Sequence, residues 1–242
     1  MSFNVVIPAR LGSKRLPGKV LLDIAGKPML QHTYEKAKRS GAKQVFIATD
    51  DDKIKSVAIQ FGAKVIMTDS GHNSGTERIQ QAVSELNLDV RDIIVNVQAD
   101  EPLIPPSAID QVASNLKSNK EAGISTLCER IFLRSEIEDP NTVKVVINNK
   151  NEALYFSRAV IPYGKGSDAI PYYRHIGIYG YRVEILNSFI RWPSSELEKA
   201  ENLEQLRALH NGTKIHVGVT NLKIPSGVDT ERDLEVVQGI LS

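Results

Sequence analysis

The sequence predicts an α/β fold in which helices flank a mostly parallel sheet and a hairpin-rich lobe is inserted. Short apolar runs alternate with helical patterns from residue 3 to about residue 128, which is typical of βαβ crossovers in a parallel sheet. The second half differs, because a turn-prone segment joins two short strand patterns. No linker or repeat divides the 242 residues. We therefore expect one domain, 1–242, with the lobe at about 130–182.

The individual elements follow from the spacing of apolar residues. Continuous apolar runs predict strands at 3–9, 45–50, 64–68, 93–98 and 123–128. Periodic patterns between them predict helices at 28–40, 52–61, 76–88 and 106–119. In the second half we expect a hairpin of 142–148 and 152–157, strands at 175–181 and 214–219, and helices at 183–191, at 200–210 and from about 230.

The composition is that of an ordinary globular protein. Hydrophobic residues make up 41%, charged residues 24% and aromatic residues 6%, which excludes disordered, collagenous and disulfide-scaffold chains. Thirty basic and 29 acidic residues leave a net charge of +1, and this balance disfavours a nucleic-acid binder. With Cys128 as the only cysteine and no apolar run of about 18 residues, we expect a soluble, cytoplasmic protein.

The loop after the first strand is strongly basic. Residues 10–19 contain Arg10, Lys14, Arg15 and Lys19, no acidic residue, and glycine near both ends. Ligands of open α/β sheets bind beyond the carboxyl ends of strands, so this loop is a candidate polyphosphate site. It matches neither the dinucleotide fingerprint nor the P-loop. The alternative is a basic loop that is only solvated. The position of the loop, directly after the first strand, makes this alternative less favoured.

Two aspartates are candidate metal ligands. Asp100 follows the fourth predicted strand, and Asp229 precedes the last predicted helix. Magnesium is usually held by one or two carboxylates together with phosphate oxygens and water. The alternative interpretation of Asp100 is that it only forms a turn. For Asp229 a plain helix N-cap is at least as good an interpretation on chemistry alone.

Other chemistries find little support. The five histidines form no paired zinc-binding spacing. The segment 71–75 places its serine one position too late for the nucleophile elbow of a hydrolase.

Several motifs together resemble one family. They are IPAR (7–10) with RLPGK (15–19), ATDD (48–51), SGTER (74–78), NVQ (96–98) with DEP (100–102), ALYFSR (153–158), HIGIY (175–179), LEQLR (203–207) and GVDT (227–230). Over nearly its full length the chain is similar to the 3-deoxy-manno-octulosonate cytidylyltransferases. The first and fourth motifs occur widely among sugar nucleotidyltransferases, whereas the SGTER, YFSR and LEQLR blocks point to this family.

The resemblance implies a Rossmann-like fold of the nucleotide-diphospho-sugar transferase type, a homodimer and a Mg²⁺-dependent reaction. That reaction is CTP plus 3-deoxy-D-manno-octulosonate (Kdo) giving CMP-Kdo and diphosphate, for lipopolysaccharide biosynthesis. Matching positions imply that Lys19, Asp100 and Asp229 are catalytic, the two aspartates as metal ligands. They imply nucleotide binding by Ala9, Arg10, Arg15, Lys19, Ser74, Gly75 and Thr76, and sugar-acid binding by Arg78, Gln98, Arg158, His175, Tyr179 and Glu204.

One position departs from the family pattern. Ala99 stands where the family usually has glycine before the aspartate. A positive φ there would strain alanine by about 1 kcal/mol or more; we expect a backbone conformation that alanine tolerates. Two alternatives stay open at this point: another acceptor, such as a sialic acid or an amino-substituted octulosonate, and a regulatory protein that keeps the phosphate loop without chemistry.

Overall fold

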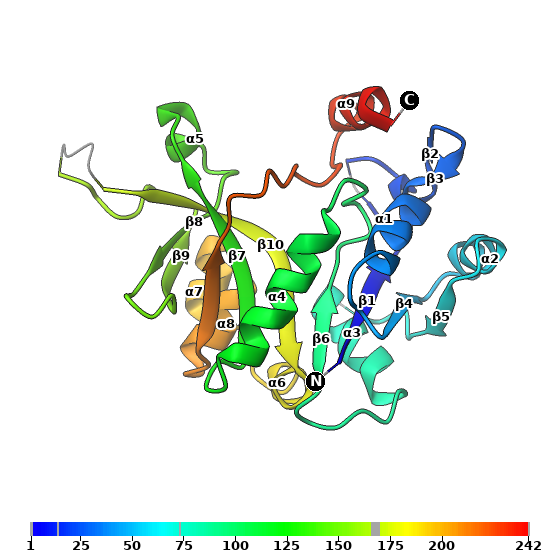
Figure 1. Ribbon diagram of the computed structural model, residues 1–242, viewed down its shortest axis with the longest axis horizontal. Helices are drawn as coiled ribbons and strands as arrows, with labels where there is room; N and C mark the ends of the chain where they lie inside the picture. Colours follow the sequence, from blue (N-terminus) through cyan, green and yellow to red (C-terminus); the bar gives the residue numbers. More distant parts are fainter. Residues whose placement is uncertain (1, 14, 73, 166–169, 242) are drawn as a thin grey trace.

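The computed structural model describes residues 2–13, 15–72, 74–165 and 170–241, and within them nine strands form one mixed sheet (Figure 1). Its main order is β11-β7-β10-β6-β1-β4-β5, and the hairpin β8–β9 attaches through β10. The strands are β1 (Phe3–Ala9), β4 (Gln44–Thr49), β5 (Lys64–Met67), β6 (Ile93–Asn96), β7 (Ile124–Ile131), β8 (Lys144–Ile147), β9 (Ala153–Ser157), β10 (Tyr172–Arg182) and β11 (Ile215–Val219). Four strands, β6, β1, β4 and β5, are mutually parallel, as are β7 and β11. Strand β10 lies antiparallel between these two groups.

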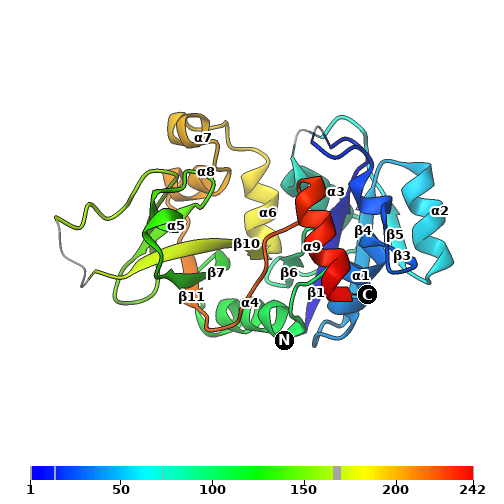
Figure 2. The ribbon, with the colours of Figure 1, turned by 90° about the horizontal axis from the view of Figure 1, so that it is seen from above.

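Helices cover both faces of the sheet (Figure 2). They are α1 (Met29–Lys38), α2 (Asp52–Gln60), α3 (Gly75–Ser84), α4 (Pro106–Ser118), α5 (Arg134–Glu138), α6 (Val183–Phe189), α7 (Glu196–Glu201), α8 (Gln205–His210) and α9 (Glu231–Leu241). One apolar core packs α1, α2 and α4 against the sheet, and a second packs α3, α6 and α8 against it. The predicted α/β architecture, with helices flanking a mostly parallel sheet, is confirmed.

The second half differs from the prediction in detail. The predicted helix 200–210 is wrong, because the segment forms two helices, α7 and α8, separated at Asn202, whose φ is 52°. The predicted hairpin is confirmed as β8 and β9. It is part of the main sheet, because β8 pairs with β10 at Lys144 and Arg174. Strand β10 also starts earlier than expected, at Tyr172.

Four short elements were not predicted. They are the 3-10 turn η1 (Lys19–Leu21), the two-residue strands β2 (Asp23–Ile24) and β3 (Lys27–Pro28), and α5. Elements of two to five residues are too short for an apolar period to show.

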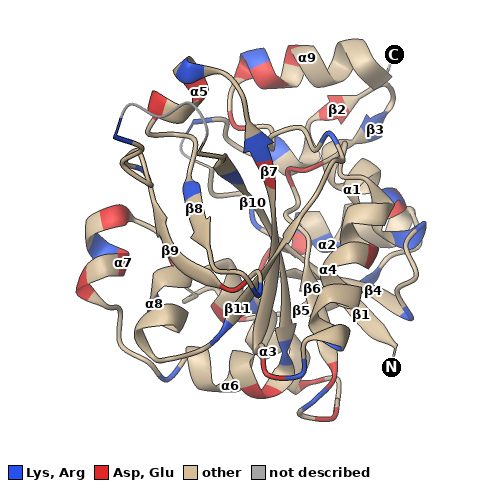
Figure 3. Ribbon diagram, turned by 60° about the vertical axis from the view of Figure 1, so that its left-hand side comes forward, with Lys and Arg blue, Asp and Glu red and all other residues tan. Residues whose placement is uncertain are grey.

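Along the ribbon in Figure 3, basic and acidic residues are intermixed on α7 and on the first part of α9. This agrees with the near-zero net charge and argues against one extended basic face. No helix among the described residues is long and apolar enough to cross a membrane.

Sheet topology brings two sequence-distant loops together. Strands β1 and β6 are adjacent and parallel, with Val6 opposite Asn96. Their carboxyl ends therefore face the same edge, and the loops that follow them, 10–19 and 97–102, lie side by side there.

Candidate active site

A cavity of about 450 Å³ opens at this edge of the sheet. The residues lining it come from the loop after β1, from the loop after β6 and from the segment before α9. They include Arg10, Arg15, Lys19, Gln98, Ala99, Asp100 and Asp229. The basic loop and both predicted metal ligands therefore share one cavity.

Lys19 lies at the centre of this group. Its Nζ donates to Oδ2 of Asp100 at 2.5 Å, to Oδ1 of Asp229 at 2.8 Å and to the carbonyl of Val228 at 2.9 Å. Gly18, with φ 67°, turns the chain into η1 and starts this segment, a conformation that glycine adopts without strain. Burial lowers the pKa of Lys19, but the two carboxylates outweigh it and the pKa lies above its ordinary value. Lys19 is therefore charged at neutral pH.

Asp229 is bound from two sides by the basic loop. Besides Lys19, Nη2 of Arg15 lies 2.7 Å from Oδ2 of Asp229. The N-cap interpretation of Asp229 is wrong: Oγ1 of Thr230 accepts the N–H of Asp233 at 3.2 Å, so the capping role falls to Thr230. The carboxylate of Asp229 is left to face the cavity.

Asp100 is fixed through its backbone. Its carbonyl accepts the N–H of Val228 at 2.8 Å. Gly227 passes so close that a Cβ there would lie 3.3 Å from both the carbonyl oxygen and Oδ1 of Asp100. The preceding Ala99 is not among the residues with positive φ, which confirms that alanine is tolerated at this turn.

A smaller cavity of about 100 Å³ adjoins the first. It is lined by Pro8, Ala9, Arg10, His72, Ser74, Gly75, Arg78 and Gln98. Pro8, Arg10 and Gln98 line both cavities, so the two spaces lie side by side around these residues.

The start of α3 shapes the smaller cavity. Ser74 caps the helix, because its Oγ accepts the N–H of Glu77 at 3.2 Å. Arg78 is buried and held by Oδ2 of Asp50 at 3.0 Å and by the hydroxyl of Thr68. These bonds fix the guanidinium in the cavity wall.

Thr76 is placed differently from its neighbours. It is buried and is not among the residues that line either cavity. Its Oγ1 donates to Oε2 of Glu204 at 2.6 Å, while Oε1 of Glu204 is buried without a hydrogen-bond partner. Thr76 thus connects the smaller cavity's loop to Glu204, at the start of α8.

His175 and Tyr179 lie on β10, on the lobe side. Their rings are 5.3 Å apart, and Oγ1 of Thr126 is 3.0 Å from Nε2 of His175. Burial and the nearby Arg174 lower the pKa of His175 to about 3, and burial raises the pKa of Tyr179. Both groups are neutral at physiological pH. His175 lines a further cavity of about 370 Å³, with Glu101 and Arg174, rather than the cavity of Lys19.

Four predicted residues line none of these three cavities: Thr76, Arg158, Tyr179 and Glu204. Arg158 donates to the carbonyls of Glu201 at 2.9 Å and Pro140 at 3.1 Å, and lines none of the three. Lys14, the remaining basic residue of the loop, lies outside the described residues.

Sequence reasoning overlooked His72 and Glu101. His72 lines the smaller cavity and bonds Gln81; its position two residues before Ser74 was the available signal. Glu101 is next to Asp100, and burial together with that charge raises its pKa to about 8. No sequence pattern shows that its side chain turns inward.

The donor set fits magnesium arriving with a nucleotide. Across the part of the chain that the structure describes, no three His, Cys, Asp or Glu side chains are arranged to hold a metal ion. Two carboxylates, however, converge on one cationic group, the Lys19 ammonium. Magnesium commonly takes one or two protein carboxylates and completes its shell with phosphate oxygens and water.

Comparison with known proteins gives a consistent result. The family described as "Cytidylyltransferase" matches residues 4–215. A 3-deoxy-manno-octulosonate cytidylyltransferase from Cellvibrio japonicus is 52% identical over 251 residues, covering 100% of this chain and 98% of that protein. One from Hahella chejuensis is 50% identical over 250 residues, covering 100% and 98%.

Solved structures agree. CMP:2-keto-3-deoxy-manno-octonic acid synthetase, in a complex with CTP, superposes with a TM-score of 0.94 at 41% identity, covering 99% of this chain and 98% of the other. A cytidylyltransferase from Leptospira borgpetersenii has a TM-score of 0.65 at 18% identity, covering 98% and 85%. At that identity the likeness concerns the fold alone.

Proposed function

Because this chain belongs to the 3-deoxy-manno-octulosonate cytidylyltransferases, we propose that it transfers CMP from CTP to Kdo and releases diphosphate. The observation that carries this proposal is the meeting of Lys19, Asp100 and Asp229 in one cavity beside the 74–78 segment. A cationic loop opposite paired carboxylates suits a metal-bound triphosphate.

The reaction needs no protein nucleophile. The anomeric 2-hydroxyl of Kdo attacks the α-phosphorus in line, a new O–P bond forms, and the α–β bridging P–O bond breaks. Diphosphate takes the bonding electrons, and the hydroxyl proton passes to water. Such transfers depend mostly on positioning and charge neutralisation.

The charge of each cavity residue suggests its role in the reaction. Arg10, Arg15 and Lys19 would neutralise the leaving diphosphate, and Asp100 with Asp229 would hold Mg²⁺. Bound there, Mg²⁺ would supply charge neutralisation at the phosphates. The Lys19 ammonium already makes three hydrogen bonds, to Asp100, Asp229 and Val228, so a contact with a phosphate would replace at least one of them.

The residues proposed for the base and for the sugar acid meet in the smaller cavity, which Ser74, Gly75, Arg78 and Gln98 line together. Ser74 and Gly75, which line the smaller cavity, would face cytosine, whose C4 amine is a donor that backbone carbonyls can select. Thr76 would support this nucleotide-binding segment from behind, through its bond to Glu204. For the sugar acid we propose Arg78, Gln98, Arg158, His175, Tyr179 and Glu204. Neutral His175 and Tyr179 suit hydroxyl groups, while Arg78 suits a carboxylate.

We also propose a homodimer formed by the lobe. A groove of about 490 Å³ is lined by apolar residues that include Ile131, Phe132, Val160 and Tyr163. Phe132 is 79% and Tyr163 87% exposed, and exposed apolar groups of this kind are typical of interaction sites. Light scattering should give twice the 26.7 kDa chain mass; a monomer at micromolar concentration would refute the dimer.

One assay tests the reaction directly. The four nucleoside triphosphates are each combined with Kdo, an amino-substituted octulosonate and a sialic acid, and diphosphate release is measured. We expect turnover with CTP and Kdo, for lipopolysaccharide biosynthesis in the cytoplasm. Faster turnover with another acceptor would assign that acceptor instead, and none with any pair would refute the proposal.

A further inference from the structure

We propose that Asp233, on α9, is a positioning residue for the catalytic centre, because its carboxylate fixes the backbone from which Asp229 projects. The inference rests on the proposed role of Asp229 as a metal ligand. Asp233 itself does not touch Lys19 or line the cavity.

One carboxylate oxygen of Asp233 accepts three hydrogen bonds. Its Oδ2 accepts the N–H of Asp229 at 3.1 Å, the N–H of Thr230 at 2.9 Å and the hydroxyl of Thr230 at 2.8 Å. In return, Oγ1 of Thr230 accepts the N–H of Asp233 at 3.2 Å. The bond from the N–H of Thr230 to Asp233 and the return bond from the N–H of Asp233 to Oγ1 of Thr230 are those of an ordinary capping box. The bond to the N–H of Asp229 is additional, and it lies on the residue whose side chain meets Lys19.

The helix that carries Asp233 is anchored to the same loop that supplies Lys19. Val237 of α9 packs with Leu16, from the basic loop, and with Val228, the residue before Asp229. Ile24 and Met29 complete this cluster, and α9 lies beside strand β2 (Figure 1). The apolar cluster holds α9 in place, and the hydrogen bond from the N–H of Asp229 to the Asp233 carboxylate holds the Asp229 backbone relative to α9.

Groups that orient a metal ligand matter beyond the stability they add. Removal of such an outer-shell partner typically weakens metal affinity or activity by about 10- to 100-fold. A residue that only capped α9 would change stability and leave the metal site as it was. These two roles can be separated because Asp233 and Thr230 share the cap but not the bond to Asp229.

The test uses the full-length enzyme with CTP and without sugar acid, so that nothing turns over. Binding of Mn²⁺ to the enzyme–CTP complex is followed by the loss of the free-ion EPR signal. We expect Asp233→Ala to weaken Mn²⁺ binding about 10-fold, and Asp233→Asn, whose amide oxygen can still accept the N–H groups, to restore most of it. With Kdo present, Asp233→Ala should raise the half-saturating Mg²⁺ concentration for diphosphate release by a similar factor.

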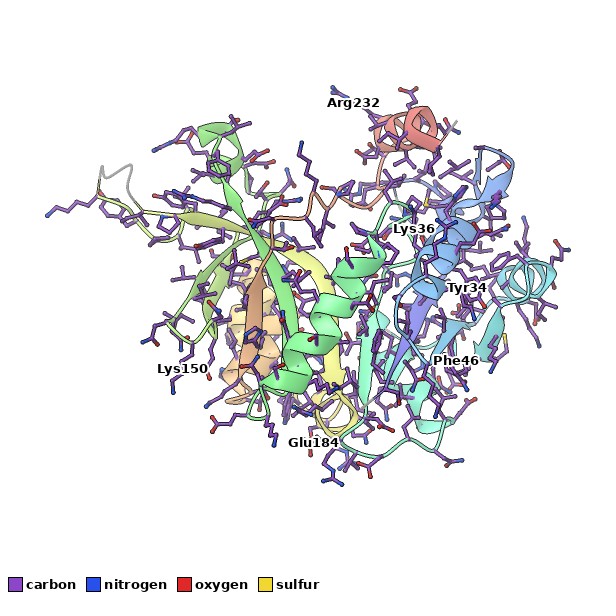
Figure 4. All side chains as sticks on the ribbon, viewed as in Figure 1. Tyr34, Lys36, Phe46, Lys150, Glu184 and Arg232 are labelled. Atoms are coloured by element: carbon purple, nitrogen blue, oxygen red, sulfur yellow. The ribbon has the colours of Figure 1, made fainter. Side chains whose placement is uncertain are left out.

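Three matched variants make the result decisive. Thr230→Val removes the capping hydroxyl but leaves the carboxylate bonded to the N–H of Asp229; it should lower Tm and keep Mn²⁺ affinity within about twofold of wild type, since an outer-shell effect is about 10-fold or more. Arg232→Ala alters the neighbouring residue, whose side chain extends away from α9 (Figure 4), and should change neither. Asp229→Ala reports whether Asp229 binds the metal at all.

Each outcome has one meaning. If Asp229→Ala leaves Mn²⁺ binding unchanged, the proposed metal role itself is wrong. If Asp229→Ala weakens binding but Asp233→Ala does not, or if Thr230→Val weakens it as much as Asp233→Ala, the positioning role of Asp233 is overturned. Should Asp233→Ala not fold, Asp233→Ser takes its place, because its shorter side chain also gives up the N–H of Asp229: an about 10-fold loss of Mn²⁺ affinity supports the proposal, and near-wild-type affinity refutes it.

Discussion

Lys19 and Asp229 are separated by 210 positions in the sequence, yet the Nζ of Lys19 donates to Oδ1 of Asp229 at 2.8 Å. The same ammonium bonds Asp100. One lysine therefore neutralises both carboxylates that would hold the metal ion. Two acidic groups this close repel each other unless a cation lies between them.

Replacement of Lys19 by methionine removes the positive charge that lies between the two carboxylates and that would bind the phosphates of CTP. We expect kcat with CTP and Kdo to fall about 10²- to 10³-fold, the usual cost of losing a preorganised charge, and KM for CTP to rise. Steady-state diphosphate release measures both. Lys27→Met is the matched control, since Lys27, on strand β3, is a half-buried lysine that pairs with Glu35 of α1 and does not line the cavity. Wild-type CTP kinetics in Lys19→Met would contradict the phosphate-loop assignment.

Asp100→Asn keeps the shape of the side chain and removes its charge. Because the Asp100 backbone is held by Val228, the fold should be retained while kcat falls by about two orders of magnitude or more. Circular dichroism and thermal melting check the fold, and single-turnover assays check the chemistry. Turnover near the wild-type rate would remove Asp100 from the metal site.

Two glycines of the C-terminal segment should respond in opposite ways. In Gly227→Ala the new Cβ would press on Asp100 at 3.3 Å, and we expect kcat to fall about 10-fold or more, since small displacements of reacting groups are costly. Gly239, on α9, has open space around its Cβ position, so Gly239→Ala should leave kcat alone and stabilise the fold by about 0.5–1 kcal/mol. Equal kinetics in the two variants would show that Gly227 does not crowd Asp100.

The pKa of His175 gives a pH dependence of stability with a defined sign. Burial lowers this pKa to about 3 in the folded state, below the ordinary 6.5 of the unfolded chain. Between these values the unfolded state binds a proton that the folded state does not, so His175 makes stability fall as pH drops, by at most about 1.4 kcal/mol per pH unit. Urea unfolding from pH 7.5 to 4.5 should show a shallower slope for His175→Gln than for wild type. The exposed His210, changed to glutamine, is the control; equal slopes for His175→Gln and wild type would refute the assignment.

Local patterns predicted most of the parallel half of the sheet. Strand β1 is a continuous apolar run and was placed at its observed bounds, because a strand buried on both faces leaves such a run. The break between α7 and α8 was missed, because it depends on Asn202 taking a left-handed conformation. Asn can adopt this conformation, but the sequence does not require it.

The candidate site was predictable in its charges and less so in its contacts. The basic loop and Asp100 follow strands, so their shared edge follows from topology. For Asp229 the chemistry left two interpretations; because Thr230 caps α9, the N-cap interpretation is wrong, and the metal role of Asp229 stays a prediction. The partners of Arg158 lie 18 and 43 positions away, and local spacing carries no information about such bonds.

The antiparallel strand β10 has a consequence for how the protein forms. In the sheet, β7 hydrogen-bonds β10 and β11, both of which follow it in the chain. During synthesis, residues 124–131 therefore leave the ribosome before either of their partner strands, β10 and β11, has been made. Strand β7 can pair only after synthesis has passed residue 172, whereas β1, β4, β5 and β6, on the right in Figure 1, can assemble as they are made.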